Sequence, residues 1–283
     1  MFSPMFSPVF LLQTIWDKLV NGPIREPIFF LHVPKCGGTS IDRSMRWRYR
    51  FRDFLHSRTL DAGAAVKVVS LLHQSDDAHT EALLPATLQY REELLLYFLS
   101  QKDNTYISGH FAFSDLAYSE YSEKYAFVTV LRDPVEMWIS NYFFMKHRRT
   151  GEDVWVRNVD IETFMASDFG KACGTNYVRF LTGEHVHQEQ QPSSLVDRAK
   201  SNLDKFAAVG ILEDLEKFRK DFELRFGVRL RIPKVNTSPL PQPERDRIVT
   251  DAVRKRIHEI CAQDMEIYQY ARDRVEYRKV IQR

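Results

Sequence analysis

The sequence predicts an α/β fold, P-loop-like and built in three layers, with helices flanking a central, mainly parallel sheet. Short apolar runs at residues 28–33, 125–131 and 207–212 are typical of strands that are buried on both faces of such a sheet. Segments with helical periodicity lie between these runs, and this alternation is the usual pattern of α/β domains. Apolar residues make up 44% of the 283 residues, which is enough for a sizeable core.

The first strand is expected at 28–33, where a nearly all-apolar run ends at Pro34. A Lys-Cys-Gly-Gly segment follows, and then Thr39 or Ser40 is suited to cap a helix that begins near Ile41. The predicted α/β domain therefore begins with a strand, a glycine-containing turn and a helix.

The middle of the chain alternates in the same way. Residues 79–100 form a long helical pattern, and the second strand is expected near 105–107. The third strand covers 125–131, and the helix after it runs over 134–147 with Pro134 in its first turn, where proline is tolerated.

The last part of the chain adds one strand and two helical segments. Residues 207–212 read as a buried strand, and the charged amphipathic segment 213–226 stops at Gly227, a common helix end. The proline-rich stretch 233–243 is expected to be a loop, and 244–277 has helical periodicity with no breaker.

The N-terminal segment and the cysteines limit the classes of protein that the sequence can encode. Residues 1–26 are expected to form an apolar or helical extension whose apolar run is too short to span a bilayer, and 27–283 a single α/β domain. Cys36, Cys173 and Cys261 are too far apart for a CxxC zinc pair, and free buried thiols in a reducing compartment are expected.

The charges nearly balance, with 40 Lys and Arg against 38 Asp and Glu and a net charge of +2. This excludes a nucleic-acid coat protein, an acidic tail protein and a disordered segment, but not a local basic pocket. Five arginines between Arg43 and Arg52 form either a solvated helix face or a surface for an acidic acceptor.

The turn after the first strand has the composition of a phosphate-binding loop. Gly37 and Gly38 let the backbone approach an anion, and the following helix directs free N–H groups at it. Lys35 adds a full charge, while Thr39 and Ser40 add hydroxyl donors. Lysine precedes the glycines here, opposite to the Walker A order, which argues against an ordinary ATPase or GTPase. A Gly-Gly turn capped by Thr39 is the structural alternative.

A second anion-binding candidate follows the third strand. Arg132 lies at the carboxyl end of that strand, where ligands bind in open α/β sheets, and Ser140 lies about two helical turns later. Arginine offers a bidentate fork to a phosphate, and serine adds a donor. Alternatively, Arg132 forms a structural salt bridge with Asp133 or Glu136.

Three motifs in order resemble those of the PAPS-dependent sulfotransferases, especially the uronyl 2-O-sulfotransferases and other carbohydrate sulfotransferases. Pro-Lys-Cys-Gly-Gly-Thr-Ser at 34–40 is similar to the family's 5′-phosphosulfate loop, and 132–140 is similar to its 3′-phosphate motif. Between them, Ser-Gly-His-Phe at 108–111 resembles the Gly-His element that supplies the catalytic base. A helix, a Val-Gly strand and an acidic helix at 195–226 continue the resemblance, which covers most of the chain from residue 28.

The resemblance implies in-line transfer of a sulfuryl group from PAPS to a hydroxyl or amine acceptor. His110 would be the base and Lys35 would stabilise the leaving phosphate; a packing or capping role is the alternative for His110. No metal is required. The residues expected to bind PAPS are Lys35, Cys36, Gly37, Gly38, Thr39, Ser40, Arg132 and Ser140, with Lys234 and Ser238 as weaker candidates.

Two positions and one loop depart from the family's pattern. Cys36 stands where the family usually has threonine, so a hydroxyl is lost while the backbone N–H remains. Ser108 stands where the uronyl enzymes have a second histidine, which puts their glycan specificity in doubt. The loop 233–239, which contains Lys234 and Ser238, replaces a lysine-rich loop.

The resemblance also implies the partners. The acceptor is expected to be a small molecule or a saccharide, and neither nucleic acid nor a transmembrane anchor is expected. Because the first strand begins near Ile28, leaving no room for an anchor and stem, a soluble cytoplasmic enzyme is favoured. Two alternatives stay open: an ATP- and magnesium-dependent kinase-like P-loop enzyme, and a non-catalytic nucleotide- or glycan-binding module.

Overall fold

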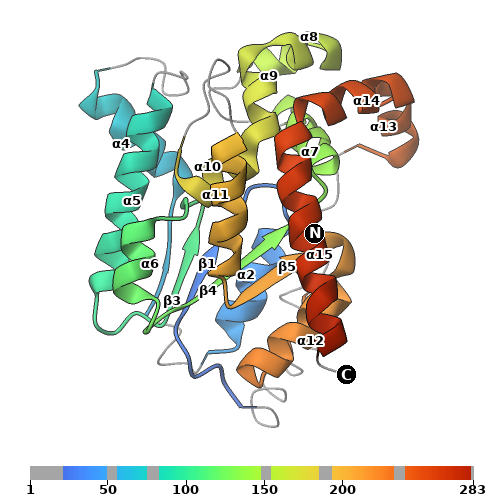
Figure 1. Ribbon diagram of the computed structural model, residues 1–283. Coiled ribbons are helices and arrows are strands. Elements are labelled where there is room, and N and C mark those ends of the chain that lie inside the picture. The colour runs from blue at the N-terminus through green and yellow to red at the C-terminus, as the bar shows by residue number, and fades with distance from the viewer. Residues whose placement is uncertain are drawn as a thin grey trace, which may run out of the picture.

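Five parallel strands form the central sheet, in the order β2-β3-β1-β4-β5. The computed structural model describes residues 22–49, 56–74, 83–147, 154–184, 193–232 and 240–281. The strands are β1 (Ile28–Leu31), β2 (Ser57–Thr59), β3 (Tyr106–Gly109), β4 (Ala126–Leu131) and β5 (Ala208–Ile211). The prediction of an α/β fold with a mainly parallel sheet flanked by helices is confirmed (Figure 1).

Strand β1 lies at the centre of the sheet and is buried along its whole length. Phe29 is in register with Ile107 of β3 on one side and with Phe127 of β4 on the other. Successive side chains of a strand point to opposite faces, so Phe29 and Phe30 belong to different layers of the core. Strands β3, β4 and β5 are also fully buried, which explains why their sequences are nearly continuous apolar runs.

On the face of the sheet that contains Phe30 lie α2 (Gly38–Trp47) and α12 (Leu215–Phe226). Helix α2 places Ile41 and Met45 in this layer, and α12 contributes Phe218 and Phe222. Both helices present apolar residues three or four positions apart, the spacing of one helix face.

The opposite face, which contains Phe29, is covered by α5, α6, α10, α11 and α15 (Figure 1). Their apolar side chains, such as Leu95, Val196 and Ile267, share one core cluster with β1. The bounds are α5 (Leu84–Ser100), α6 (Asp115–Tyr121), α10 (Asn176–Thr182), α11 (Ser193–Asp204) and α15 (Ala262–Ile281).

A third apolar cluster surrounds Trp138, beyond the carboxyl ends of the strands. The Trp138 indole N–H donates to the carbonyl of Gly170 at 2.7 Å, so this buried polar group is satisfied. The elements around it are α7 (Pro134–His147), η3 (Val154–Asn158), α8 (Ile161–Ala166), α9 (Asp168–Ala172), η4 (Cys173–Thr175) and α14 (Asp251–Ile260).

Several predicted boundaries are corrected by the structure. Helix α2 begins at Gly38, before Ile41, because Gly37 adopts φ 71° and serves as the N-cap. The helix predicted over 79–100 begins at Leu84, and residues 75–82 lie outside the described residues. The second strand extends to Gly109.

Several elements were missed by the sequence reading, among them α6, α8, α9 and α10, and one predicted helix was wrong. Strand β2 and α4 (Ala62–Leu72) were not predicted, and the segment 244–277 is not one helix. It contains α13 (Gln242–Ile248), α14 and α15, because the Thr250 hydroxyl caps α14 and Cys261 ends it. The helix predicted over 213–226 is a short turn, η5 (Leu212–Asp214), followed by α12, which ends at Gly227 as expected.

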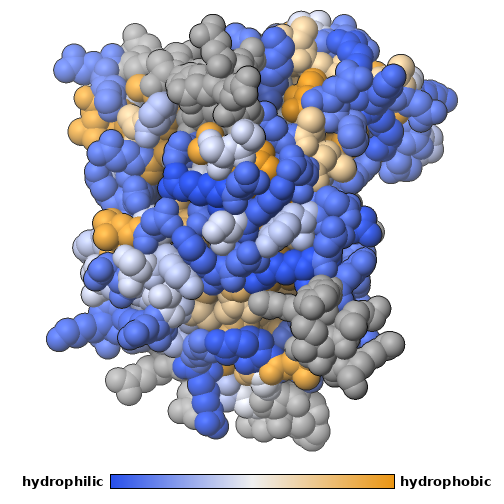
Figure 2. Space-filling model, viewed as in Figure 1, coloured by the Kyte–Doolittle hydropathy of each residue, from blue (hydrophilic) through white to orange (hydrophobic). Residues whose placement is uncertain are grey.

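The remaining predictions concern the N-terminal extension, the membrane and the cysteines. The segment 1–21, most of the predicted extension, lies outside the described residues. Within the described part of the chain, no helix is long and apolar enough to cross a membrane. Hydrophilic residues cover most of the face in Figure 2. All three cysteines are free and buried, as predicted.

Candidate active site

The site lies where three strand ends meet at the carboxyl edge of the sheet. The segment after β1 enters α2 on one face, whereas the chain after β4 passes through α7 to α11, which packs on the other face. In open α/β sheets a crevice forms at such a divergence, and ligands bind there. The turn after β1, the residues after β3 and the residues after β4 therefore converge at one place.

The turn after β1 is shaped by two left-handed residues. Lys35 has φ 64° and Gly37 has φ 71°, so the chain reverses tightly before α2 begins at Gly38. A Cβ on Gly38 would overlap the imidazole ring of His32, so the packing of His32 requires glycine there. The first N–H groups of α2 are thereby presented at this turn, as a phosphate cradle requires.

Lys35 projects over the ring of Phe144 on α7, with Nζ 3.8 Å from the ring centroid. Burial, followed by the charge of Arg132, lowers the pKa of Lys35 to about 8. The ammonium group is therefore still mostly charged at neutral pH, but it lies in an environment that disfavours an uncompensated charge. An anion bound at the turn would supply that compensation.

Arg132 joins the residues after β4 to the turn after β1. Its Nη1 donates to the carbonyl of Lys35 at 3.1 Å, and its Nη2 is 3.9 Å from Glu136. The predicted alternative, a salt bridge to Glu136, is thus present at long range, but Glu136 lies closer to Arg254, at 2.6 Å. Half-buried Ser140 lies one turn before Phe144 on α7, so the two share a helix face on the side of Lys35.

His110 follows β3 and faces the same turn. Its Nδ1 is 2.6 Å from the carbonyl oxygen of His32. A carbonyl only accepts, so Nδ1 carries the hydrogen and Nε2 keeps a free lone pair. Burial, followed by the positive charges of Arg91 and Lys35, lowers the pKa of His110 below its ordinary value; the bond to His32 opposes this. A neutral imidazole with a defined tautomer can accept a proton at Nε2.

A family model described as the sulfotransferase family matches residues 24–271. The chain belongs to the sulfotransferase family. The matched region begins just before β1, ends within α15 and includes Lys35, His110 and Arg132. No curated protein matches the chain. The predicted enzyme class, a PAPS-dependent sulfotransferase, is confirmed, whereas the match does not distinguish the uronyl 2-O branch from others.

The cysteine in the predicted phosphate loop of this sulfotransferase points into the protein interior. Cys36 is 1% exposed, and its Sγ lies 3.6 Å from the hydroxyl of Tyr177 and 3.7 Å from the sulfur of Met137. Burial raises the pKa of the Cys36 thiol to about 12, so it stays protonated. A hydroxyl at this position would point into the same packed interior, so the cysteine removes no donor from the open side of the loop.

Tyr177 is a site residue that the sequence reading missed. Its hydroxyl accepts from the backbone N–H of Arg132 at 2.7 Å and donates to the carbonyl of the same residue. Together with the contact to Cys36, these bonds tie α10 to both of the predicted phosphate motifs. No local pattern reveals this, because Tyr177 lies 45 residues from Arg132 and 141 from Cys36.

His32 was also missed. Burial, followed by the charges of His110 and Lys35, lowers the pKa of His32 to about 3, so its ring is neutral. The ring packs 4.5 Å from that of His110 and fills the space that Gly38 leaves. The available signal was its place as the first residue after β1, two residues before Pro34, where the predicted phosphate loop begins.

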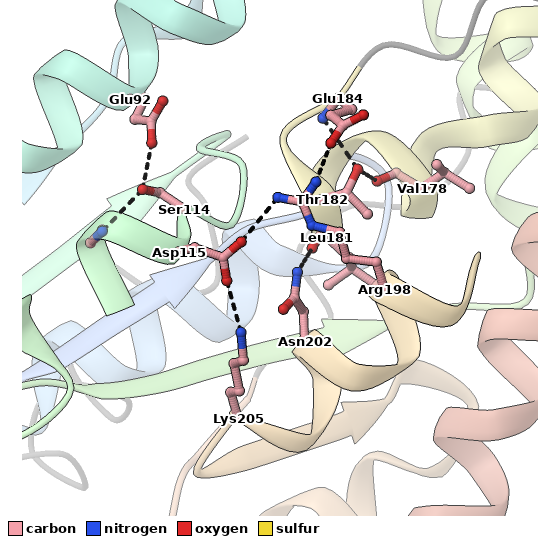
Figure 3. A network of polar contacts seen from close by, with 11 residues as sticks. Glu92, Ser114, Asp115, Val178, Leu181, Thr182, Glu184, Arg198, Asn202 and Lys205 are labelled. Carbon is pink, nitrogen blue, oxygen red and sulfur yellow. Dashed lines mark hydrogen bonds and ion pairs between the residues drawn. The ribbon is translucent and has the colours of Figure 1, made fainter. Parts of the chain in front are cut away.

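A polar network fixes the segment that carries His110 to α10 and α11 (Figure 3). Ser114 caps α6 and donates to Glu92 at 2.5 Å, while Asp115 accepts from Arg198 at 3.0 Å and from Lys205 at 2.8 Å. The backbone N–H of Phe113 donates to the carbonyl of Phe180 on α10 at 2.8 Å. The segment that carries His110 is therefore held by several contacts, although the ion pairs of Asp115 are exposed and individually weak.

The other predicted residues have mixed outcomes. Ser108 is buried and lies 3.3 Å from the hydroxyl of Thr59 on β2. Thr39 is half-buried at the start of α2, and Ser40 is buried. Lys234 and Ser238 lie outside the described residues.

Two described arginines of the arginine-rich segment, Arg46 and Arg48, have partners within the protein. Arg46 pairs with Asp42 at 2.6 Å, and buried Arg48 donates to the carbonyl of Gly22 at 3.1 Å. Arg50 and Arg52 fall outside the described residues. The described residues contain no group of three metal-ligating side chains.

Proposed function

We propose that this sulfotransferase moves a sulfuryl group from PAPS to an acceptor hydroxyl, with His110 as the base. The observation that carries the proposal is the hydrogen bond from His110 Nδ1 to the carbonyl of His32, which leaves Nε2 free beside the phosphate loop. The half-buried side chains of His110, Lys35 and Arg132 leave access from solvent. An amine acceptor would satisfy the same geometry.

In the proposed reaction the acceptor oxygen forms a bond to sulfur as the bond from sulfur to the bridging phosphate oxygen breaks. His110 Nε2 takes the hydroxyl proton. Lys35 offsets the negative charge that grows on the departing phosphate, which becomes the 5′-phosphate of PAP. Arg132 and Ser140 hold the 3′-phosphate that distinguishes PAPS from ATP, while the N–H groups at the start of α2 bind the 5′ group. The chemistry needs no metal ion.

The residues present fit an anionic nucleotide. Burial and the charge of Arg132 lower the pKa of Lys35, and Gly38 has no side chain to fill the cradle. We propose that Cys36, Gly37 and Gly38 contribute only backbone groups, and Thr39 and Ser40 hydroxyls and N–H groups. Lys234 and Ser238 remain weaker candidates for closing over the nucleotide.

The acceptor is proposed to be a small hydroxylated molecule or a saccharide, and the enzyme is proposed to act in the cytoplasm. Support for a reducing compartment comes from the three free, buried thiols, none of which forms a disulfide. We propose no nucleic-acid partner, since the net charge of the chain is only +2.

The test combines donor binding with turnover. Wild-type protein is mixed with PAPS and a pool of hydroxylated acceptors, and PAP release is measured alongside PAP affinity by calorimetry. His110→Ala should abolish turnover and keep PAP affinity, whereas Arg132→Ala should weaken PAP binding by about 1.5–3 kcal/mol, the scale of a charged hydrogen bond. His258→Ala, an exposed histidine on α14, is the matched control.

Two outcomes would favour other functions. Tighter binding of ATP with magnesium than of PAP would support a kinase-like enzyme. PAP binding with no turnover in the wild type, unaffected by His110→Ala, would support a non-catalytic nucleotide-binding module.

A further inference from the structure

The turn after β4 carries Arg132, and side chains from α10 and η5 fix its backbone. Strand β4 ends at Leu131, so the residues that follow lie outside the ladder of the sheet. The backbone N–H of Arg132 donates to the hydroxyl of Tyr177 at 2.7 Å, and that of Asp133 donates to Oε1 of Glu213 at 3.1 Å. The direction in which the Arg132 guanidinium leaves the turn therefore depends on where Tyr177 and Glu213 are placed.

Asp264, in the first turn of α15, places Tyr177. Its carboxylate accepts from the backbone N–H groups of Tyr177 at 2.9 Å and of Val178 at 3.2 Å, at the start of α10. Asp264 is 0% exposed, and burial raises its pKa to about 7, whereas the bonds from α10 and the charge of Arg179 oppose that rise. A buried carboxylate needs such bonds, so they fix the start of α10 relative to α15. Because Asp264 is fully buried, any effect that it has on a nucleotide must pass through Tyr177.

Tyr268, one helical turn after Asp264, places Glu213. Tyr268 is 3% exposed, and its hydroxyl donates to Oε2 of Glu213 at 3.0 Å, so this carboxylate joins α15 to the backbone N–H of Asp133. Residues four positions apart share a helix face. One face of α15 therefore reaches the turn after β4 by two routes. The route through Asp264 is buried, whereas Glu213 is exposed, so the first should contribute more.

We propose that Asp264 and Tyr268 are positioning residues for Arg132, so that α15 contributes to the selection of a nucleotide with a 3′-phosphate. The inference rests on the proposed role of Arg132 in binding that phosphate. A guanidinium fork makes its bidentate contact only in a restricted range of orientations. A shift in the backbone of Arg132 should therefore weaken the contact to the 3′-phosphate more than the contacts of the 5′-phosphate with the N–H groups of α2.

The test compares PAP with AMP, which lacks only the 3′-phosphate, by titration calorimetry. The ratio of the two affinities reports the contact to the 3′-phosphate, and the wild type should bind PAP at least tenfold more tightly, the scale of a charged hydrogen bond. Asp264→Asn should lower this ratio about fivefold, the factor that corresponds to one hydrogen bond of about 1 kcal/mol. Tyr268→Phe should lower it about twofold, because water competes for exposed Glu213.

Two matched controls remove similar groups that do not reach Arg132. Asp160 also caps a helix, α8, through a bond of 2.8 Å from the N–H of Thr163. Tyr270 lies on α15, and its hydroxyl donates to exposed Asp204 at 2.7 Å. Asp160→Asn and Tyr270→Phe should leave the ratio of PAP to AMP affinity at the wild-type value.

A double-mutant cycle separates positioning from a general loss of stability. If Asp264 acts through Arg132, adding Asp264→Asn to Arg132→Ala should lower the ratio no further. A purely structural role would lower the Tm of Asp264→Asn and leave its ratio of PAP to AMP affinity unchanged.

Two results would overturn the inference while leaving the proposed function in place. The first is a wild-type ratio in Asp264→Asn or, where that variant does not fold, in Tyr268→Phe. The second is an equal fall in the ratio when Arg132 is already alanine. Failure of the proposed function looks different: the wild type would bind PAP and AMP equally, or release no PAP from PAPS, and equal binding would end the inference as well.

Discussion

The hydroxyl of Tyr177 is expected to hold the two phosphate motifs in register, and Tyr177→Phe removes it alone. The change leaves the backbone N–H of Arg132, now bonded at 2.7 Å, and the carbonyl of Arg132 without this partner. Each lost partner of a partly buried group costs about 1 kcal/mol or more, so we expect a loss of about 2 kcal/mol in the free energy of unfolding. For a chain of this size that corresponds to a fall in Tm of roughly 4–8 °C.

The same variant should weaken PAP binding about tenfold, or about 1.4 kcal/mol, since the Arg132 guanidinium would be anchored on a looser backbone. Differential scanning calorimetry gives the Tm, and titration calorimetry gives the PAP affinity. The matched control is Tyr142→Phe, because the hydroxyl of buried Tyr142 makes one long bond, 3.3 Å, to the carbonyl of Val159. It should lower stability slightly and leave PAP affinity unchanged. Equal PAP affinity in both variants would refute the positioning role of Tyr177.

Two further predictions concern the loop and the pH dependence. Gly38→Ala should lower the free energy of unfolding by about 1–3 kcal/mol and reduce turnover, because the new Cβ overlaps the His32 ring. The control Gly63→Ala in α4 should be tolerated, since the nearest atom to its new Cβ is 3.4 Å away. Equal Tm values for the two variants would contradict this prediction. On the acid side, kcat/KM should fall only at pH values below 6.5, the ordinary histidine pKa, because the pKa of His110 is lowered. On the alkaline side, kcat/KM should fall as the pH rises through about 8, where Lys35 loses its proton. Lys35→Arg should move the alkaline limb upward, and an unmoved limb would assign it to another group.

Local sequence was sufficient for the parts of the site that lie directly after strands. The positions of Lys35 and Arg132 follow from the rule that ligands bind at the carboxyl ends of parallel strands, and the structure connects the two through one hydrogen bond. The sheet itself was predictable because its buried strands are continuous apolar runs. Strand β2 escaped notice because it has only three residues, Ser57–Thr59, and none of them is buried.

The supporting residues could not be predicted, because their roles depend on contacts between distant segments. Tyr177 reaches Arg132 only after α10 packs against the end of β4, and Arg91 reaches the carbonyl of His110 only after α5 packs beside β3. The direction of the Cys36 side chain likewise depends on the left-handed conformation of Lys35 and Gly37. Spacing along the chain carries no information about these distances.

The most direct measurement of the central claim is the rate of PAP formation in a single turnover of PAPS-bound enzyme mixed with an excess of an acceptor from the hydroxylated pool. His110→Ala should lower this rate by roughly 10²–10⁴-fold, the usual contribution of a positioned base, while its PAP dissociation constant stays within about twofold of the wild type. A variant that keeps the wild-type rate, with the donor bound equally well, would show that His110 does not take the proton and would contradict the account.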